Sequence, residues 1–223
     1  MKLRNYTKQK NIIYWIIGIS IVFLLIANAF AWIYLQRIRS YFDSDLKFRM
    51  ENIIQISSKL IDATYLTLIV PGDENDPQVI YYQQLLFDIK EKNELQDIYI
   101  ISPARDLLIG VNPDFIIGNN NNSIEPELIK TALAGKIASS DIYTLGNHKF
   151  LTAAIPLIDE SNAITGILVA EARAEFFSVI EEFNNGLVLF SLINALVILT
   201  VAFFLYRSLK NLIELQNKVK TQE

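Results

Sequence analysis

The residue types that most often carry chemistry are scarce in this chain. It has one histidine, His148, and no cysteine, so disulfides and thiolate metal sites are excluded. One histidine without a regular set of acidic residues is also a poor ligand set for a metal ion. Nucleophilic catalysis needs a nucleophile beside a base, and no such pair stands out. The sequence therefore predicts no catalytic residue, no metal and no cofactor, and it gives an enzymatic function little support.

Two long apolar segments divide the chain, at residues 12–35 and 187–206. Each has about 20 residues or more, which at ~1.5 Å per residue crosses a ~30 Å hydrocarbon core. In the second segment only Ser191, Asn194 and Thr200 are polar. A membrane helix tolerates such residues when they bond to its own carbonyls or face a partner helix. The sequence thus predicts two transmembrane helices.

Basic residues indicate how these helices are oriented. Lysine and arginine precede the first segment and follow the second, and no acidic residue lies before the first. The positive-inside rule therefore places both termini in the cytoplasm and residues 36–186 outside. His148 then lies outside, after the hairpin-turn dipeptide Gly146-Asn147, as an exposed turn residue or a pH sensor. There it is out of reach of cytoplasmic ATP and is no phosphate acceptor.

A cleavable signal peptide is the alternative interpretation of the first segment. Ala27-Asn28-Ala29 and Ala29-Phe30-Ala31 both resemble small-residue cleavage sites. The apolar run continues past them through residues 32–35, and this length favours a membrane span. The predicted division is a cytoplasmic N-terminus (1–11), a span (12–35), an extracytoplasmic domain (36–186), a second span (187–206) and a cytoplasmic tail (207–223). The net charge of −4 argues against nucleic-acid binding.

The extracytoplasmic domain begins with two predicted helices, over residues 36–70 and 78–93. The first carries apolar residues at spacings of three and four, namely Phe42, Leu46, Met50, Ile53, Ile56 and Leu60. This stripe fits a helix packed on its own domain, and it fits equally a stalk paired with a second copy of the chain.

Strand patterns follow these helices. Apolar and β-branched runs predict strands over residues 97–101, 107–111, 140–145, 149–158 and 164–172. A short helix is expected over 125–134, and another over 173–185 leads into the second span. Five antiparallel strands with helices packed on them make an α+β domain.

Four phrases in this order resemble the extracellular single-Cache (PAS-like) sensor domains of bacterial receptors. They are IYIISPARD (98–106), LIKTALAGK (128–136), LTAAIPL (151–157) and ITGILVA (164–170). The resemblance covers roughly residues 36–186 and implies a five-stranded antiparallel sheet with a long N-terminal helix. It also implies an apolar ligand pocket with a few placed polar groups between the sheet and its covering elements.

The resemblance makes five residues candidates for contacting a small ligand in that pocket: Tyr99, Arg105, Tyr143, His148 and Phe150. Arg105 would pair bidentately with a carboxylate ligand, or it is a solvated turn arginine beside Asp106. Tyr143 is either a ligand contact or a core aromatic with a solvated hydroxyl.

The tail looks like the signalling helix that precedes the dimerisation domain in membrane histidine kinases. Its apolar residues fall at heptad-like spacing, at Leu205, Leu212, Leu215 and Val219. The sequence thus predicts the input half of a two-component sensor in a bacterial inner membrane, acting as a homodimer. A response regulator is a partner only if a kinase domain follows. The alternative is a membrane-anchored scaffold whose outer domain binds another protein.

Overall fold

The computed structural model of the chain describes residues 2–112, 116–120 and 124–220. It contains two compact units. The sheet unit comprises Arg39–Val179, and the helical unit comprises Met1–Ile38 together with Ile180–Glu223. The helical unit contains both apolar segments, and the sheet unit contains every predicted strand.

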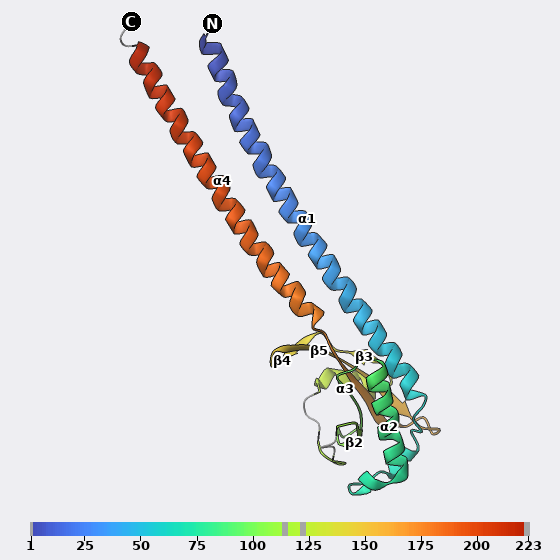
Figure 1. Ribbon diagram of the computed structural model, residues 1–223. Coiled ribbons are helices and arrows are strands. Elements are labelled where there is room, and N and C mark those ends of the chain that lie inside the picture. Colours follow the sequence, from blue (N-terminus) through green and yellow to red (C-terminus); the bar gives the residue numbers. More distant parts are fainter. Residues whose placement is uncertain (1, 113–115, 121–123, 221–223) are drawn as a thin grey trace. The chain divides into compact units, whose positions relative to one another are not determined.

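The sheet unit is built on one antiparallel sheet of six strands (Figure 1). The strands are β1 (Asp97–Ile101), β2 (Leu107–Gly110), β3 (Ala138–Ser139), β4 (Tyr143–Leu145), β5 (His148–Ile158) and β6 (Ile164–Arg173). Their spatial order is β2-β1-β6-β5-β3, and β4 also pairs with β5. β5 and β6 form a long antiparallel hairpin. Phe150 pairs with Arg173 at one end of it, and Ile158 pairs with Ile164 at the other.

The prediction of one strand over residues 140–145 is wrong, and this accounts for the sixth strand. β3 lies just before this segment, at residues 138–139, and within the segment only residues 143–145 form a strand, β4. The Thr152 N–H donates to the Ser140 hydroxyl at 3.0 Å, so a side chain occupies a place that a backbone carbonyl would take in a regular ladder. The strand pairing is interrupted there and resumes at Tyr143 opposite Phe150.

Four α-helices accompany the sheet: α1 (Lys2–Ser58), α2 (Pro77–Lys92), α3 (Pro126–Leu133) and α4 (Phe176–Lys220). The expectation that the first helix reaches residue 70 is wrong. The hydroxyls of Ser57 and Ser58 bond back to the carbonyls of Ile53 and Gln55, and such bonds compete with helix continuation. A short 3-10 helix, Tyr65–Leu68, follows instead.

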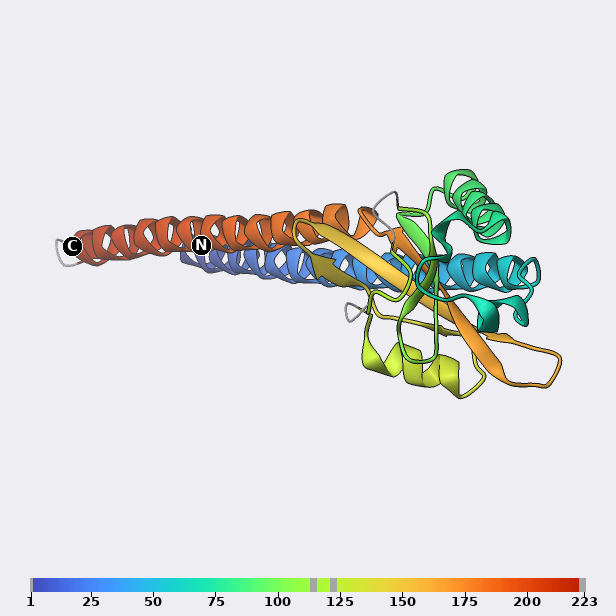
Figure 2. The ribbon, with the colours of Figure 1, turned by 90° about the horizontal axis from the view of Figure 1, so that it is seen from below.

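The helices cover both faces of the sheet, with α2 and α3 on opposite sides (Figure 2). One core contains residues of α1 and α2 with Ile98 and Ile100 of β1. A smaller core contains residues of α3 with Tyr99 and Ile101, the alternate positions of the same strand. This two-residue alternation is what a pleated strand imposes, and it means that β1 serves two different faces.

The apolar stripe of α1 is only partly the packing face. Met50 is buried as predicted, and so is Ile54, which the prediction missed. Ile56 and Leu60 are exposed at 66% and 53%, so their assignment to the packing stripe is wrong. Leu60 lies beyond the end of α1 at Ser58, whereas Ile56 lies within the helix but on a face that is not covered by the core. Pairing of α1 with a second copy stays a prediction.

Two helical segments, Gly18–Ser58 and Phe176–Ser208, are long and apolar enough to cross a membrane, and the helical unit contains most of the second and the first part of the first. Within this unit the Ser191 hydroxyl donates to Asn28 Oδ1 at 2.6 Å, and the Asn28 amide donates to the Leu24 carbonyl at 2.9 Å. Polar side chains between membrane helices are expected to pair in this way. The side chains of the heptad-like tail residues Leu205, Leu212, Leu215 and Val219 lie outside the described residues.

Candidate ligand-binding site

The face of the sheet that α3 covers carries a cluster of polar side chains on three adjacent strands. Glu171 of β6 lies between its register partners Asp97 of β1 and Thr152 of β5. The Tyr99 hydroxyl, from the same face of β1, donates to Glu171 Oε1 at 3.0 Å. Alternate positions of buried strands normally hold aliphatic side chains, so this set marks a local departure from core packing.

Tyr143 extends this cluster from β4. Its hydroxyl lies 2.9 Å from the Thr152 hydroxyl, and its ring centroid lies 6.0 Å from that of Phe150. Phe150 and Thr152 are buried, whereas Tyr143 is 36% exposed. We call Tyr99, Tyr143, Phe150, Thr152 and Glu171 the α3-face site. It combines a carboxylate, two phenol hydroxyls and aromatic rings, with Tyr143 open to solvent.

The electrostatics of this site follow from burial. The pKa of Glu171 is raised, mainly because the carboxyl group is buried. The hydrogen bond from Tyr99 lowers this pKa, and the nearby Asp97 carboxylate raises it further. Burial also raises the pKa of Asp97, and that of Tyr143. Carboxyl groups with perturbed pKa values are concentrated at functional sites because a stable core would avoid their desolvation. The α3-face site is therefore a candidate for binding a ligand.

Three of the five sequence-predicted ligand residues, Tyr99, Tyr143 and Phe150, come together in this site. His148 lies beside it at the start of β5, half-exposed, with Nδ1 3.3 Å from Glu175 Oε1 and its ring 6.3 Å from that of Phe150. Arg105 is not brought to the cluster. It lies in the β1–β2 turn with φ of 74°, at the end of β1 opposite to Asp97.

Thr152 and Glu171 are the site residues that the sequence prediction missed. Both lie inside the phrases that resemble sensor-domain strands or directly after them, in runs that are otherwise apolar. A charged residue within an otherwise apolar predicted strand is the signal that would have indicated Glu171.

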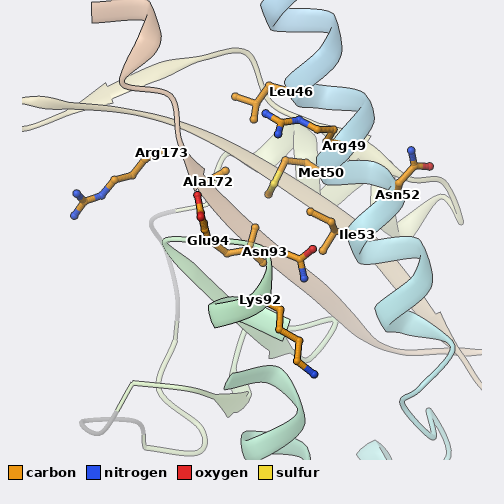
Figure 3. Close-up of a pocket in the computed structure, with 11 residues that line it drawn as sticks. Leu46, Arg49, Met50, Asn52, Ile53, Lys92, Asn93, Glu94, Ala172 and Arg173 are labelled. Carbon is orange, nitrogen blue, oxygen red and sulfur yellow. The ribbon is translucent and has the colours of Figure 1, made fainter. Parts of the chain in front are cut away.

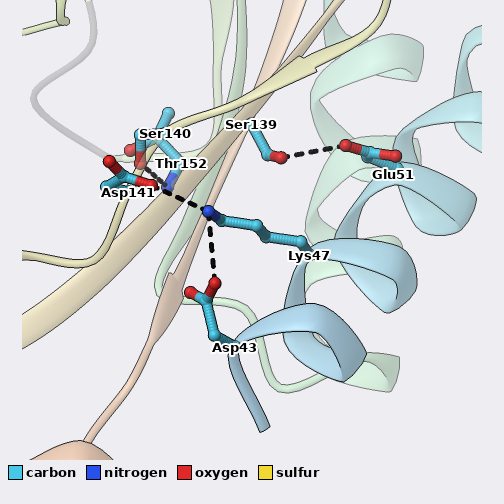
Figure 4. Close-up of polar contacts among 7 residues, drawn as sticks. All are labelled: Asp43, Lys47, Glu51, Ser139, Ser140, Asp141 and Thr152. Carbon is cyan, nitrogen blue, oxygen red and sulfur yellow. Dashed lines mark hydrogen bonds and ion pairs between the residues drawn. The ribbon is translucent and has the colours of Figure 1, made fainter. Parts of the chain in front are cut away.

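A polar connection joins the neighbourhood of this site to α1 (Figure 4). Ser140, which binds the Thr152 backbone, is flanked by Ser139 and Asp141. The Ser139 hydroxyl donates to Glu51 Oε1 at 2.9 Å, and Lys47 Nζ lies 2.8 Å from Asp141 Oδ1. Burial lowers the pKa of Lys47, but the hydrogen bonds and charges of Asp141 and Asp43 outweigh it and the pKa is raised. Residues 139–141 thus contact both the site and α1.

Comparisons with known proteins agree with this architecture. No protein-family model and no curated protein matches the sequence. Among solved structures, the sensor domain of the Vibrio cholerae histidine kinase DctB is similar with a TM-score of 0.50 and 20% identity. The match covers 66% of this chain and 55% of that one, so this chain spans about half the length of the DctB structure.

Two further structures are similar at lower scores. The Escherichia coli DcuS sensor domain matches with a TM-score of 0.35 and 18% identity, over 47% of this chain and 72% of that one. A domain of a sensory box/GGDEF family protein from Vibrio parahaemolyticus matches with a TM-score of 0.49 and 12% identity, over 70% and 64%. The predicted fold class is confirmed: the chain has the α+β fold of Cache/PAS-like sensor domains, with a long N-terminal helix and a second long apolar helix.

Proposed function

We propose that this chain is the sensory input module of a bacterial membrane receptor and that it binds a small ligand at the α3-face site. The observation that carries the proposal is the group of Tyr99, Tyr143, Thr152 and Glu171 on one sheet face. A ligand that donates hydrogen bonds to Glu171 would recover part of the cost of desolvating this carboxyl group.

The charge of the site indicates the kind of ligand. Within the described part of the chain, the charged neighbour that shifts the pKa of Glu171 is Asp97, which is itself an acid. A protonated amine would neutralise Glu171, and the rings of Tyr143 and Phe150 would add cation–π attraction. A carboxylate would be repelled unless it carried an amine as well. We therefore propose an amine-bearing ligand, in place of the carboxylate that Arg105 suggested.

The connections of the site support a relay across the membrane. β6 carries Glu171 and ends at Arg173, three residues before α4 begins at Phe176, and α4 contains the second span-length segment. Residues 139–141 connect the site to α1. A ligand that favours one of two arrangements of β6 would bias the start of α4. In this proposal both termini are cytoplasmic, the receptor is a homodimer, and a histidine kinase domain provides the output to a response regulator.

A screen for stabilising ligands tests the binding proposal. The full chain in lipid nanodiscs is heated with a panel of small amines, amino acids and carboxylates, and unfolding of the sheet unit is followed. We expect amine-bearing compounds to raise the midpoint and the effect to be lost in Glu171→Gln. Lys136→Gln, at an exposed position after α3, is the matched control. If no amine raises the midpoint, or if the amines act equally on Glu171→Gln, the ligand proposal fails and the scaffold alternative is favoured.

The relay is tested separately with single cysteines in the tail. Cross-linking between two copies is expected to change when a stabilising ligand from the screen is added. A proline at Phe183 breaks α4 and should abolish this change while leaving ligand binding intact. A ligand-dependent change that persists in Phe183→Pro would show that α4 is not the route.

A further inference from the structure

A groove lies on the other side of the sheet, between α1, the end of α2 and the end of β6 (Figure 3). Its volume is about 540 Å³, within the ~300–1,000 Å³ typical of ligand pockets. Met50, Leu95 and Ala172 line its floor and are buried. In Figure 3, Met50 and Ile53 point from α1 into the space that faces the α2–β1 connection. An apolar body of a small molecule would therefore find an apolar surface here.

The rim of this groove is basic. Arg49, Lys92 and Arg173 belong to it, and Glu94 is the acidic residue that lines it. Arg49 has one ion pair, with Asp45 at 3.3 Å, on the exposed side of α1. Arg173 bonds to Gln96 and lies 3.4 Å from Glu175. Among the described residues, Lys92 has no ion pair. We call these residues and the apolar floor the basic groove.

We propose that the basic groove is a second binding site, for a small anion with an apolar body such as an aryl or alkyl carboxylate. Lys92 contributes a positive charge with no ion pair among the described residues, and the Arg49 guanidinium presents a planar fork that suits a carboxylate. The charge of this site is opposite to that of the α3-face site. The two sites would therefore select different molecules, and this proposal holds whether or not the α3-face site binds an amine.

The place of the basic groove in the fold gives its occupant a regulatory role. Its walls come from α1, from the connection between α2 and β1, and from Ala172 and Arg173 at the end of β6. Glu94, in that connection, has a φ of 54°, a conformation that costs a non-glycine residue free energy. A bound anion would connect α1 to the end of β6, so it would bias the same two elements that the α3-face site contacts.

A lysine at position 92 would also be favourable without any ligand, and the test must separate this structural role from a role in binding. Lys90 and Lys92 lie in the last turn of α2, where positive charge is favourable to the helix dipole. Replacing Lys92 would then affect stability slightly without affecting any ligand. The test therefore measures binding, and it includes a variant that blocks the groove while keeping every charge.

The probe is phenylacetate, with the neutral phenylacetamide as its matched counterpart. Saturation-transfer difference NMR is recorded on the full chain in lipid nanodiscs, with empty nanodiscs as the blank. We expect phenylacetate to bind and phenylacetamide to bind at least several-fold more weakly. The double variant Arg49→Gln/Lys92→Gln should weaken phenylacetate binding about tenfold, the scale of one charge-assisted hydrogen bond. Asn52→Trp, which obstructs the groove, should abolish it.

Two controls decide the interpretation. Lys59→Gln removes an exposed charge near the end of α1, outside the groove, and should leave phenylacetate binding unchanged. Glu171→Gln should also leave it unchanged. Equal binding of the acid and the amide, no binding of either, or binding that survives Asn52→Trp overturns the basic-groove proposal. Binding that depends on Glu171 and not on Arg49 and Lys92 overturns it too, because it places the probe at the α3-face site.

Discussion

The two faces of the same sheet differ in what their strands present. Toward α1 and α2, the central strands present aliphatic residues, including Ile98 and Ile100 of β1 and Leu168 of β6. Toward α3, the alternate positions of the same strands include Tyr99 and Glu171. Both faces need an apolar layer to be stable, and only one is interrupted by a carboxylate. This difference is the reason for proposing a ligand site on the α3 face.

The two faces also differ in the sign of their accessible charge. The α3-face site is acidic and aromatic, whereas the basic groove beside α1 carries Arg49 and Lys92, and Lys92 has no ion pair among the described residues. Charges of opposite sign on opposite faces select ligands of opposite charge. A single domain of this kind would therefore integrate two chemical inputs, and each of the following measurements tests one side of the comparison.

The largest effect is expected for the packing face. Ile100→Ala removes a fully buried side chain from the core beneath α1 and α2 and should cost about 2–5 kcal/mol. Hydrogen exchange of β1 and β6 amides, read by mass spectrometry on the full chain, measures this loss. Leu145→Ala, at a position 65% exposed, should change little. A cost below about 1 kcal/mol for Ile100→Ala would contradict the assignment of this face to stability.

The carboxyl groups of the α3 face should make the sheet unit sensitive to pH. Burial raises the pKa of Glu171 above its usual 4.5, so the folded chain holds this proton longer than the unfolded chain does. Stability should therefore fall as pH rises from about the usual value through the raised pKa. Asp97 contributes in the same direction. Hydrogen exchange at several pH values should show a shallower fall in Glu171→Gln, and an unchanged slope would contradict the assignment.

A smaller effect is expected for the hydroxyl pair of the α3 face. Thr152→Val keeps the shape but removes the partner of the Tyr143 hydroxyl, and should cost about 0.5–1.5 kcal/mol. Tyr143→Phe removes the other partner and leaves the Thr152 hydroxyl unpaired. The double variant should then cost less than the sum of the two single changes. Costs that add fully would mean that the two hydroxyls do not interact.

The smallest stability effect is expected for the connection between residues 139–141 and α1. Asp141→Asn removes an ion pair with Lys47 whose carboxylate is fully exposed, and such pairs contribute little in solvent. The change should instead appear in signalling, as a reduced ligand-dependent cross-linking of the tail. Lys130→Gln removes a comparable exposed pair, with Glu127 on α3, and is the control. Equal effects of both variants on cross-linking would remove the connection from the relay.

Much of the fold follows from the sequence because local patterns determine it. The strands β1, β5 and β6 lie within about a residue of their predicted bounds, and so does α2, which begins after its Asp76 cap. The errors arise where side chains bond to the backbone. Ser57 and Ser58 terminate α1, and Ser140 interrupts a strand pairing. The spacing of apolar residues along the sequence gives no information about such bonds.

The site was less predictable than the fold, because it depends on register. Tyr99, Thr152 and Glu171 are far apart in the sequence and become neighbours only through the β1–β6 and β5–β6 pairings. Family resemblance indicated the aromatic members, Tyr99, Tyr143 and Phe150. It also indicated Arg105, which the β1–β2 turn holds at the other end of β1.

The central claim, that Glu171 is the charge partner of the ligand, is tested most directly by the pH dependence of binding. An amine that stabilises the chain in the screen is titrated against wild type and Glu171→Gln by calorimetry, at pH values across the raised pKa of Glu171. The amine stays protonated throughout, since its pKa is near 10. We predict that its affinity for wild type rises with pH as Glu171 ionises, and that Glu171→Gln binds weakly with no such rise. Equal affinity and equal pH dependence in the two proteins would contradict the account.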